Sequence, residues 1–180
     1  MSDGFQIKNQ EGLYFLTFQV VGWIDIFSRK VYRDIMINSF DYSRKNKGLE
    51  IFAYVIMTNH VHLIVRSKTG NLSDVVRDIK KYTSKQILKT IYEINESRKE
   101  WLEIVFRYHA KYNKRNSTMQ FWTHENHAVE LTTNEMISSR INYIHQNPVR
   151  AGWVENEYDY LYSSARNFTE QESVLKIDKI

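Results

Sequence analysis

The chain alternates between short apolar runs and stretches in which apolar residues recur at helical spacing. The segment Leu13 to Trp23 is apolar, aromatic and β-branched, which predicts a buried strand. A similar composition predicts a second strand at Leu49 to Met57. His60 to Val65 predicts either a third strand or an extension of the second, with a turn or bulge at Thr58 and Asn59 between the two runs.

Two helices are expected between and after these strands. Ser28 is expected to cap the first, whose apolar positions are Val31, Ile35 and Tyr42. The second helix is long and begins with Asn71 or Ser73 as its cap. Its apolar stripe consists of Leu72, Val75, Val76, Ile79, Ile87 and Ile91.

The C-terminal half predicts one more strand and one more helix. The strand is expected between Gln120 and Leu131, whereas residues 97–116 have no clear pattern. Thr132 and Glu135 form a capping box for the helix, which should end before Pro148 because proline disfavours helical geometry in the preceding residue. The order strand, helix, strand, strand, helix, strand, helix predicts an α+β protein with a ferredoxin-like, split βαβ sheet and helices on one face.

The length of 180 residues fits one domain, which we expect to span residues 1–168. The polar, acidic end at 169–180 is expected to be a loose tail. There is no Cys, so disulfides and thiolate metal sites are excluded. No apolar run is long enough to cross a membrane, and the first residues lack the apolar core of a signal peptide. We therefore expect a cytoplasmic protein with no membrane partner.

Basic residues are concentrated in the middle of the chain. Residues 66–115 contain 13 Lys and Arg against 6 Asp and Glu, whereas residues 151–180 contain 3 against 6. A repeat of four residues places four cations along one face of the second predicted helix: Arg77, Lys81, Lys85 and Lys89. Such a line is equally typical of a solvated helix surface and of a face that contacts phosphates.

His60 and His62 are the first candidates for chemistry. On a strand, alternate side chains share a face, so the two imidazoles should project side by side, as two ligands of one metal must. Paired histidines also occur in protein cores, where hydrogen bonds satisfy them. Their position within the apolar run YVIMTNHVHLIV favours the metal interpretation, because two polar rings buried there need partners.

Tyr143 is the second candidate, on the helix expected from about Thr133 to Gln146. Met136, Arg140 and Asn147 lie on its line at three- and four-residue spacing, whereas the core stripe is Ile137, Ile141 and Ile144. A phenol is a poor nucleophile at neutral pH, but a metal or an arginine near the reacting phosphate offsets this by stabilising developing charge. Taken alone, one helical tyrosine among 12 is far more often structural.

The remaining histidines and a tyrosine cluster carry weaker signals. His124 and His127 are three residues apart near a predicted strand, which would place them on opposite faces. His109 has no evident partner, and His145 points away from Tyr143 on the same helix. Three alternating tyrosines are expected to pack against the body of the protein: Tyr158, Tyr160 and Tyr162.

Several segments resemble a known family. YVIMTNHVHLIV is similar to the histidine-hydrophobic-histidine (HUH) motif of single-tyrosine, IS200-like transposases. YIHQNPVRAGWV, followed by YDYLYSSARNF, resembles the C-terminal signature of REP-associated tyrosine transposases. FWTHENHAVEL and LSDVVRDIKKYTSKQI have the same style, so the resemblance extends from about Phe52 to Phe168. It implies an antiparallel ferredoxin-like sheet and cleavage of single-stranded DNA near hairpins, with magnesium or manganese.

The resemblance also implies roles for individual residues. His60 and His62 match the metal ligands, Tyr143 matches the nucleophile that forms a 5′-phosphotyrosine, and Asn147 falls where relatives have a Gln or Asn ligand. Asn147 is alternatively a cap at the end of its helix. The expected DNA contacts are the four cations named above with Lys80, Arg140 and Arg150.

Three alternatives stay open beside a transposase. They are a hairpin-binding protein that no longer cuts, a nickase of the replication-initiator or relaxase type, and an RNA-binding module on the same fold. Relatives include both dimers and monomers, so the sequence leaves open whether the protein forms a homodimer.

Overall fold

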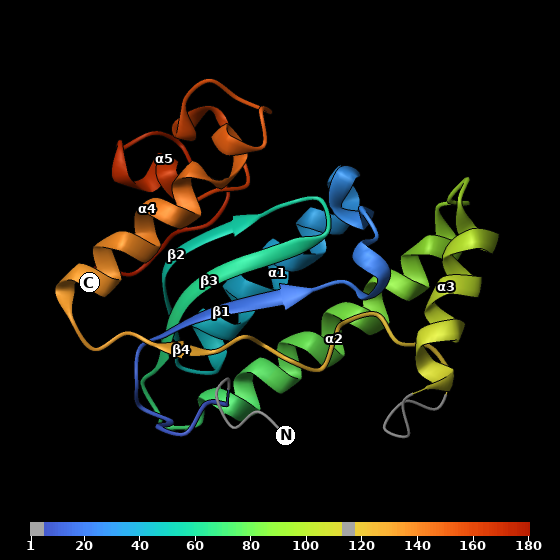
Figure 1. Ribbon diagram of the computed structural model, residues 1–180, viewed down its shortest axis with the longest axis horizontal. Helices are drawn as coiled ribbons and strands as arrows, with labels where there is room; N and C mark the ends of the chain where they lie inside the picture. Colours follow the sequence, from blue (N-terminus) through green and yellow to red (C-terminus); the bar gives the residue numbers. More distant parts are fainter. Residues whose placement is uncertain (1–5, 113–117) are drawn as a thin grey trace.

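A four-stranded antiparallel sheet in the order β2-β3-β1-β4 forms the centre of the computed structural model, which describes residues 6–112 and 118–180 (Figure 1). The strands are β1 (Tyr14–Gln19), β2 (Leu49–Ile56), β3 (His60–Ser67) and β4 (Val129–Glu130). β3 pairs with both β1 and β2, and β1 pairs with β4. The predicted α+β, ferredoxin-like arrangement is confirmed.

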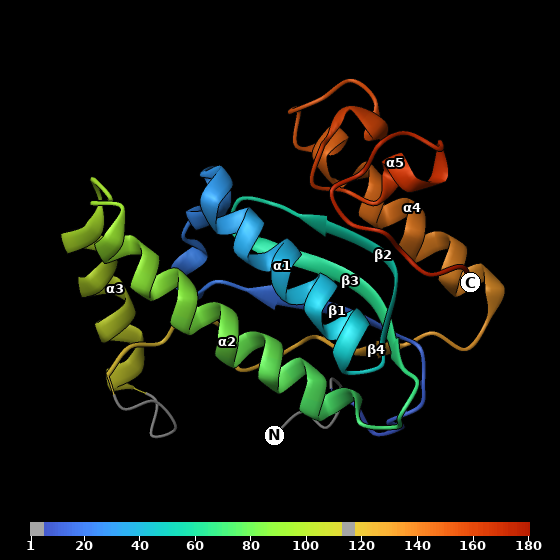
Figure 2. The ribbon, with the colours of Figure 1, turned by 180° about the vertical axis from the view of Figure 1, so that it is seen from behind.

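The helices that connect the strands share one face of the sheet. α1 (Lys30–Asn46) and α2 (Leu72–Glu93) lie side by side on that face, in front of the sheet in Figure 2. α4 (Asn134–Arg150) follows β4 and lies against β2 and β3 on the opposite face, so the expectation that the helices lie on one face holds for α1 and α2 but is wrong for α4. α3 (Lys99–Lys111) extends beyond the end of α2, in the region where the sequence had no clear pattern. The shorter helices are η2 (Val21–Trp23), η3 (Ile26–Ser28), η4 (Glu157–Asp159) and α5 (Ala165–Phe168).

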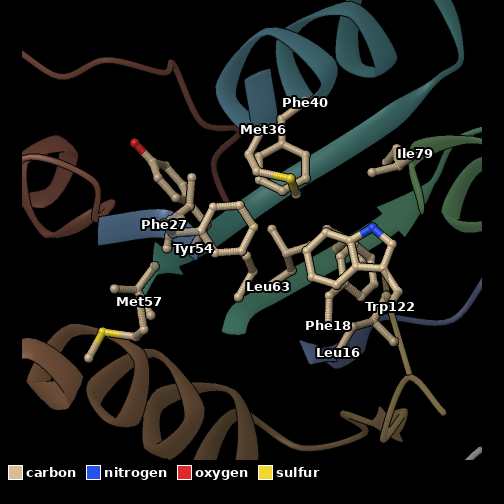
Figure 3. Close-up of a cluster of buried hydrophobic side chains, with 14 of the residues drawn as sticks. Leu16, Phe18, Phe27, Met36, Phe40, Tyr54, Met57, Leu63, Ile79 and Trp122 are labelled. Atoms are coloured by element: carbon tan, nitrogen blue, oxygen red, sulfur yellow. The ribbon is translucent and has the colours of Figure 1, made fainter. Parts of the chain in front are cut away.

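The main hydrophobic core lies between the sheet and the pair α1 and α2 (Figure 3). Leu16 and Leu63 are register partners on β1 and β3, and both side chains are buried in this core. The stripe predicted for α2 is confirmed, because all six of its side chains are buried. The side chains that meet from strands and helices include Phe18, Tyr54, Met36, Phe40, Ile79 and Trp122.

The apolar stripe expected for α1 is wrong. Val31 and Tyr42 are exposed, and the core face instead carries Tyr32, Met36, Ile37 and Phe40. Ser28 is not the cap either, because it ends a 3-10 turn and α1 begins two residues later. Tyr32, Met36 and Phe40 are larger and recur every four residues, so they bury more apolar area. They therefore determine which face of α1 packs against the sheet.

Two other boundaries differ from the sequence expectation. β1 ends at Gln19 because the chain turns through Gly22 and Trp23, which both have left-handed backbone angles, with φ of 63° and 56°. α4 begins after Thr133, whose hydroxyl accepts a hydrogen bond from the Met136 amide, and it continues through Pro148 to Arg150. Proline is tolerated there because it lies in the last turn, where it removes one backbone hydrogen bond at most.

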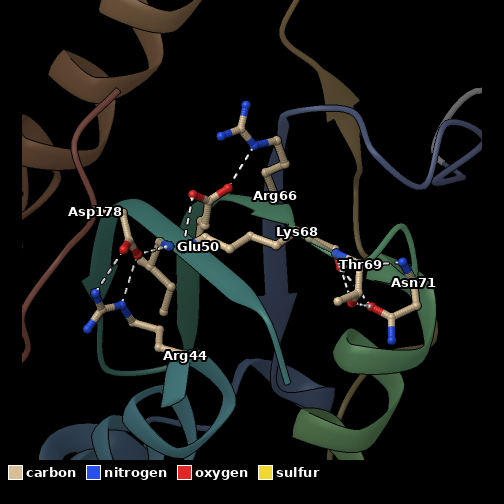
Figure 4. Close-up of polar contacts among 9 residues, drawn as sticks. Arg44, Glu50, Arg66, Lys68, Thr69, Asn71 and Asp178 are labelled. Carbon is tan, nitrogen blue, oxygen red and sulfur yellow. Dashed lines mark hydrogen bonds and ion pairs between the residues drawn. The ribbon is translucent and has the colours of Figure 1, made fainter. Parts of the chain in front are cut away.

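The C-terminal segment 169–180 is not a loose tail. Leu175 is buried, and the Asp178 carboxylate pairs with both nitrogens of the Arg44 fork at 2.9 and 3.0 Å (Figure 4). The Asp178 backbone and side chain also bond to the Ile51 backbone of β2. Residues 162–164 pair with the same strand, so its outer edge is covered. The polar composition of the segment did not predict this, because two anchoring side chains, Leu175 and Asp178, are enough to order a short segment.

Asp178→Ala is expected to destabilise the fold. It leaves the partly buried Arg44 without its carboxylate and the Ile51 amide without its acceptor, which costs about 1–3 kcal/mol. The melting temperature should fall by roughly 2–4 °C for each kcal/mol in a chain of this size. Lys179→Ala is the matched control, because Lys179 is an exposed neighbour. Equal melting temperatures for the two variants would contradict the anchoring role.

Within the described residues, no helix is long and apolar enough to cross a membrane.

Candidate active site

His60 and His62 lie at the start of β3 on the face of the sheet opposite α1 and α2. Their partners across β1 are Gln19 and Thr17, and the intervening Val61 is fully buried in the core. The two imidazole ring centres are 4.7 Å apart. The structure therefore brings both rings together on one face, as the period of a strand predicts.

Each imidazole is oriented by a polar neighbour. The Asn59 side-chain oxygen lies 2.6 Å from His60 Nδ1, and the Thr17 hydroxyl lies 2.9 Å from His62 Nδ1. An amide oxygen can only accept, so His60 carries its proton on Nδ1 and keeps a lone pair on Nε2. The Thr17 hydroxyl can donate to His62 Nδ1 or accept from it, and in the tautomer where Nδ1 donates, Nε2 of His62 keeps its lone pair as well. Such partners are typical of metal-binding histidines.

Both imidazoles are neutral at physiological pH. Burial lowers the pKa of His60 to about 4. Burial, with the charges of His60, Arg140 and Arg150, lowers the pKa of His62 to about 3. The neutral form is the one that binds a divalent metal, so the cluster is suited to a cation without first losing protons.

α4 brings Tyr143 directly over the histidines. Its ring centre is 5.3 Å from His62 and 5.9 Å from Phe15. The Arg150 guanidinium lies 4.5 Å from the Tyr143 ring centre and donates to the Tyr143 carbonyl at 2.9 Å. The Arg140 guanidinium lies 5.9 Å from the same ring. Tyr143 therefore lies beside the His62 imidazole and two permanent positive charges.

Asn147 lies one turn after Tyr143 and lines the same cleft, whose volume is about 840 Å³. Because α4 continues to Arg150 and is capped by Ala151, the alternative that Asn147 caps the helix is wrong. His60, His62 and Asn147 thus offer two neutral imidazoles and an amide oxygen to this cleft, and such nitrogen and oxygen donors could hold a divalent cation. Among the described residues, no group of three or more His, Cys, Asp or Glu could hold a metal ion.

The opposite wall of the cleft contains residues that sequence reasoning discounted or missed. Trp23, His109, His124, Glu125 and His127 all line it. The expectation that His124 and His127 point to opposite faces of a strand is wrong, because the strand there is only two residues long and His127 has a φ of 43°. An irregular backbone has no fixed side-chain period, so spacing alone could not place these residues.

His145 stands apart from the site. It is buried, and its Nε2 lies 2.9 Å from the Ser164 hydroxyl. Burial lowers its pKa to about 4. Its predicted direction, away from Tyr143, is confirmed.

The predicted DNA-binding cations fall into three groups. Arg140 and Arg150 lie beside Tyr143, as described above. A second group forms an exposed line on α2: Arg77, Lys81, Lys85 and Lys89. In this line, Arg77 forms ion pairs with Asp74 and Asp78, and Lys89 forms one with Glu93. Lys80 points inward, where its ammonium donates to Thr123 and Asn126, and burial lowers its pKa to about 8. Lys80 thus holds the segment that forms the wall of the cleft.

A shallow hollow of about 410 Å³ lies beside α2 and includes Arg77 and Lys81 in its lining. It shares Gln120, Thr123 and His124 with the histidine cleft. The two hollows therefore adjoin each other at this segment.

Replacing Lys81 and Lys85 together by Ala is expected to weaken DNA binding about equally for all sequences. For each phosphate that the protein no longer neutralises, the slope of log affinity against log salt should fall by about 0.7–0.9. Affinity measured at several salt concentrations tests this, with Lys176→Ala as an exposed control on the C-terminal segment. A weakening confined to one DNA sequence would mean that the two lysines read bases instead.

A family model matches part of the chain. Residues 24–106 match the model of a family described as transposase, IS200 like. The matched residues make up somewhat less than half of the chain. They include His60 and His62 and end before Tyr143. No curated protein matches.

A solved structure has the same fold as this chain. A REP-associated tyrosine transposase bound to a REP hairpin matches over 99% of this chain and 93% of its own, with a TM-score of 0.62 and 18% identity. A putative transposase from Deinococcus radiodurans R1 matches over 75% and 88%, with a TM-score of 0.44 and 18% identity. The family match confirms the resemblance to IS200-like transposases over residues 24–106, and the first of these structures confirms the fold.

Proposed function

We propose that the protein is a transposase that cuts and rejoins single-stranded DNA near hairpins through a covalent bond to Tyr143. The observation that supports this most directly is the meeting of Tyr143 with His62, 5.3 Å between ring centres, in one cleft. The family match adds the transposase class. Such an enzyme acts where the chromosome is, in the cytoplasm.

The side chains around Tyr143 have separable tasks in this reaction. The Arg140 and Arg150 guanidiniums attract the phosphate and stabilise the charge that develops on it. The Tyr143 hydroxyl oxygen forms a bond to phosphorus, and the bond from phosphorus to O3′ breaks. The phenolic proton passes to water in the open cleft, and O3′ takes up a proton. The products are a 5′-phosphotyrosine and a free 3′-OH.

The phosphotyrosine bond keeps the energy of the bond that was cut. A DNA 3′-OH can therefore attack it later and rejoin strands without ATP. This property separates a strand-transfer enzyme from a simple nuclease, whose product ends cannot be rejoined.

His60, His62 and Asn147 would hold the divalent cation in this proposal. The chemistry that magnesium or manganese would supply there is polarisation of the scissile phosphate and neutralisation of part of its charge. Asn59 and Thr17 fix the orientation of the imidazoles, and each ring would bind the cation through Nε2.

An unpaired strand with a hairpin nearby is the proposed substrate. The cleft lies between α4 and the segment 120–127, and a scissile strand must be unpaired from its complementary strand to reach Tyr143. The structural relative that is bound to a hairpin supports this choice. A homodimer remains part of the proposal only through surfaces other than the outer edge of β2, which the chain itself covers.

The test is covalent capture. A pool of labelled hairpins with random unpaired flanks is incubated with the protein and manganese, then run on a denaturing protein gel. A labelled protein band is expected, and it should disappear with EDTA and be far weaker on perfect duplexes. Binding of hairpins without any covalent band would contradict the proposal and leave the non-cutting alternative.

A further inference from the structure

Trp23 occupies an unusual position at the edge of the cleft. Its side chain is 70% exposed although tryptophan is usually well buried, and it lines the same cleft as His60 and Tyr143. Its backbone is left-handed, with a φ of 56°, which is unfavourable for a bulky residue. An exposed side chain that also strains the backbone contributes little to the fold, so its position needs another reason.

The turn that carries Trp23 packs against α3 and is hydrogen-bonded to Asn59. Val105 and His109 of α3 lie so close to Gly22 that a Cβ there would be 3.3 and 3.2 Å from them. The Trp23 carbonyl accepts a hydrogen bond from the Asn59 amide at 3.4 Å, and the oxygen of the same amide group contacts His60. One side chain thus fixes the exposed tryptophan and a candidate metal ligand relative to each other.

Aromatic rings continue from this point along α3. His109 lines the cleft, and its ring centre is 5.6 Å from that of Tyr108. The ring centres of Tyr108 and Tyr112 are 5.0 Å apart. Tyr108 and Tyr112 are both more than half exposed. Exposed rings that lead out of a cleft beside two arginines suit a strand of unpaired nucleotides, because every base has a face on which a ring can stack.

We propose that Trp23 stacks on an unpaired base next to the scissile phosphate, and that His109 and Tyr108 extend this contact along the strand that leaves the cleft. This inference rests on the proposed function, because it takes the cleft to be the path of the DNA strand. It adds a substrate contact that neither the histidine motif nor the tyrosine motif contains. The contact tolerates any base and requires only that the base is unpaired.

The first test measures binding without chemistry. In a Tyr143→Phe background, Trp23→Ala should weaken binding of a labelled single-stranded oligonucleotide about tenfold, within the range for removal of one stacked base. Trp23→Phe should keep most of the affinity, and binding of a blunt duplex should not change. Trp153→Ala is the matched control, because Trp153 is also exposed but packs near Tyr160, away from the cleft. Equal affinities for Trp23→Ala and Trp153→Ala would overturn the inference.

The second test locates the base. Abasic sites placed one at a time along the oligonucleotide should weaken binding to the Tyr143→Phe protein at one position, and the same abasic site should weaken binding no further in Trp23→Ala. Additive effects at every position would overturn the inference. Trp23→Gly relieves the backbone strain, so it should raise the melting temperature by about 2–4 °C and weaken binding as Trp23→Ala does. Unchanged single-strand affinity in this stabilised variant would also overturn it.

Failure of the proposed function gives a different result. A wild-type protein that forms no covalent product on any hairpin, yet binds single strands more weakly on Trp23→Ala, would keep the stacking contact and remove the chemistry. A covalent product that forms normally with Trp23→Ala, at unchanged affinity, would keep the chemistry and remove the stacking contact.

Discussion

Tyr143→Phe is expected to abolish the covalent protein–DNA product while DNA affinity stays close to that of the wild type. The substitution removes only the hydroxyl, so the ring keeps its contacts with His62, Phe15 and Arg150. Removal of a nucleophile typically lowers the rate by a factor on the order of 10⁴ or more, which takes the product below detection on a gel. The melting temperature should stay within about 2 °C of the wild type, because the packing of the ring is retained.

Tyr42→Phe is the matched control for this experiment. Tyr42 is an exposed tyrosine on α1, on the far side of the sheet from the histidines. It should form the covalent product at the wild-type rate. A product that persists in Tyr143→Phe would assign the reaction to another of the 12 tyrosines.

Replacing His60 or His62 by Ala is expected to have the second largest effect. Each change removes one of two neutral imidazoles that line the cleft. Cleavage should fall by a factor on the order of 10² or more, and half-maximal cleavage should need more manganese. Titration of cleavage against manganese measures both effects. His145→Ala serves as a histidine control, because it should lower thermal stability and leave the manganese requirement unchanged.

Asn147 extends the same titration to the third ligand. Asn147→Ala should raise the manganese requirement, whereas Asn147→Asp should keep part of the activity because it supplies an oxygen at a similar place. Asn147→Ala with the wild-type manganese requirement would remove Asn147 from the ligand set.

β1, β2 and β3 could be predicted because they are runs of apolar and β-branched residues, and α2 because its apolar residues recur at helical spacing. The six-residue stripe of α2 is buried in full, and the alternation on β3 puts both histidines on one face. α3 was missed because Trp101, Ile104 and Tyr108 are exposed on the side away from the buried Leu102 and Phe106. A helix with apolar residues on both sides has no polar face to mark its period.

The site was predictable only where it lies on regular elements. His60, His62, Tyr143 and Asn147 each follow from strand or helix spacing combined with the family resemblance. The opposite wall depends on tertiary contacts instead. Lys80 holds residues 123–126 by two hydrogen bonds, and Trp23 is placed by left-handed backbone angles. Neither kind of contact leaves a periodic signal in the sequence.

Mass spectrometry of the DNA-linked peptide tests the central claim most directly. Trypsin cuts after Arg140 and Arg150, which gives the peptide INYIHQNPVR with Tyr143 as its single tyrosine. After covalent capture and nuclease digestion, the account predicts that this peptide carries the mass of a nucleotide on Tyr143. A nucleotide on any other peptide, with residues 141–150 unmodified, would contradict it.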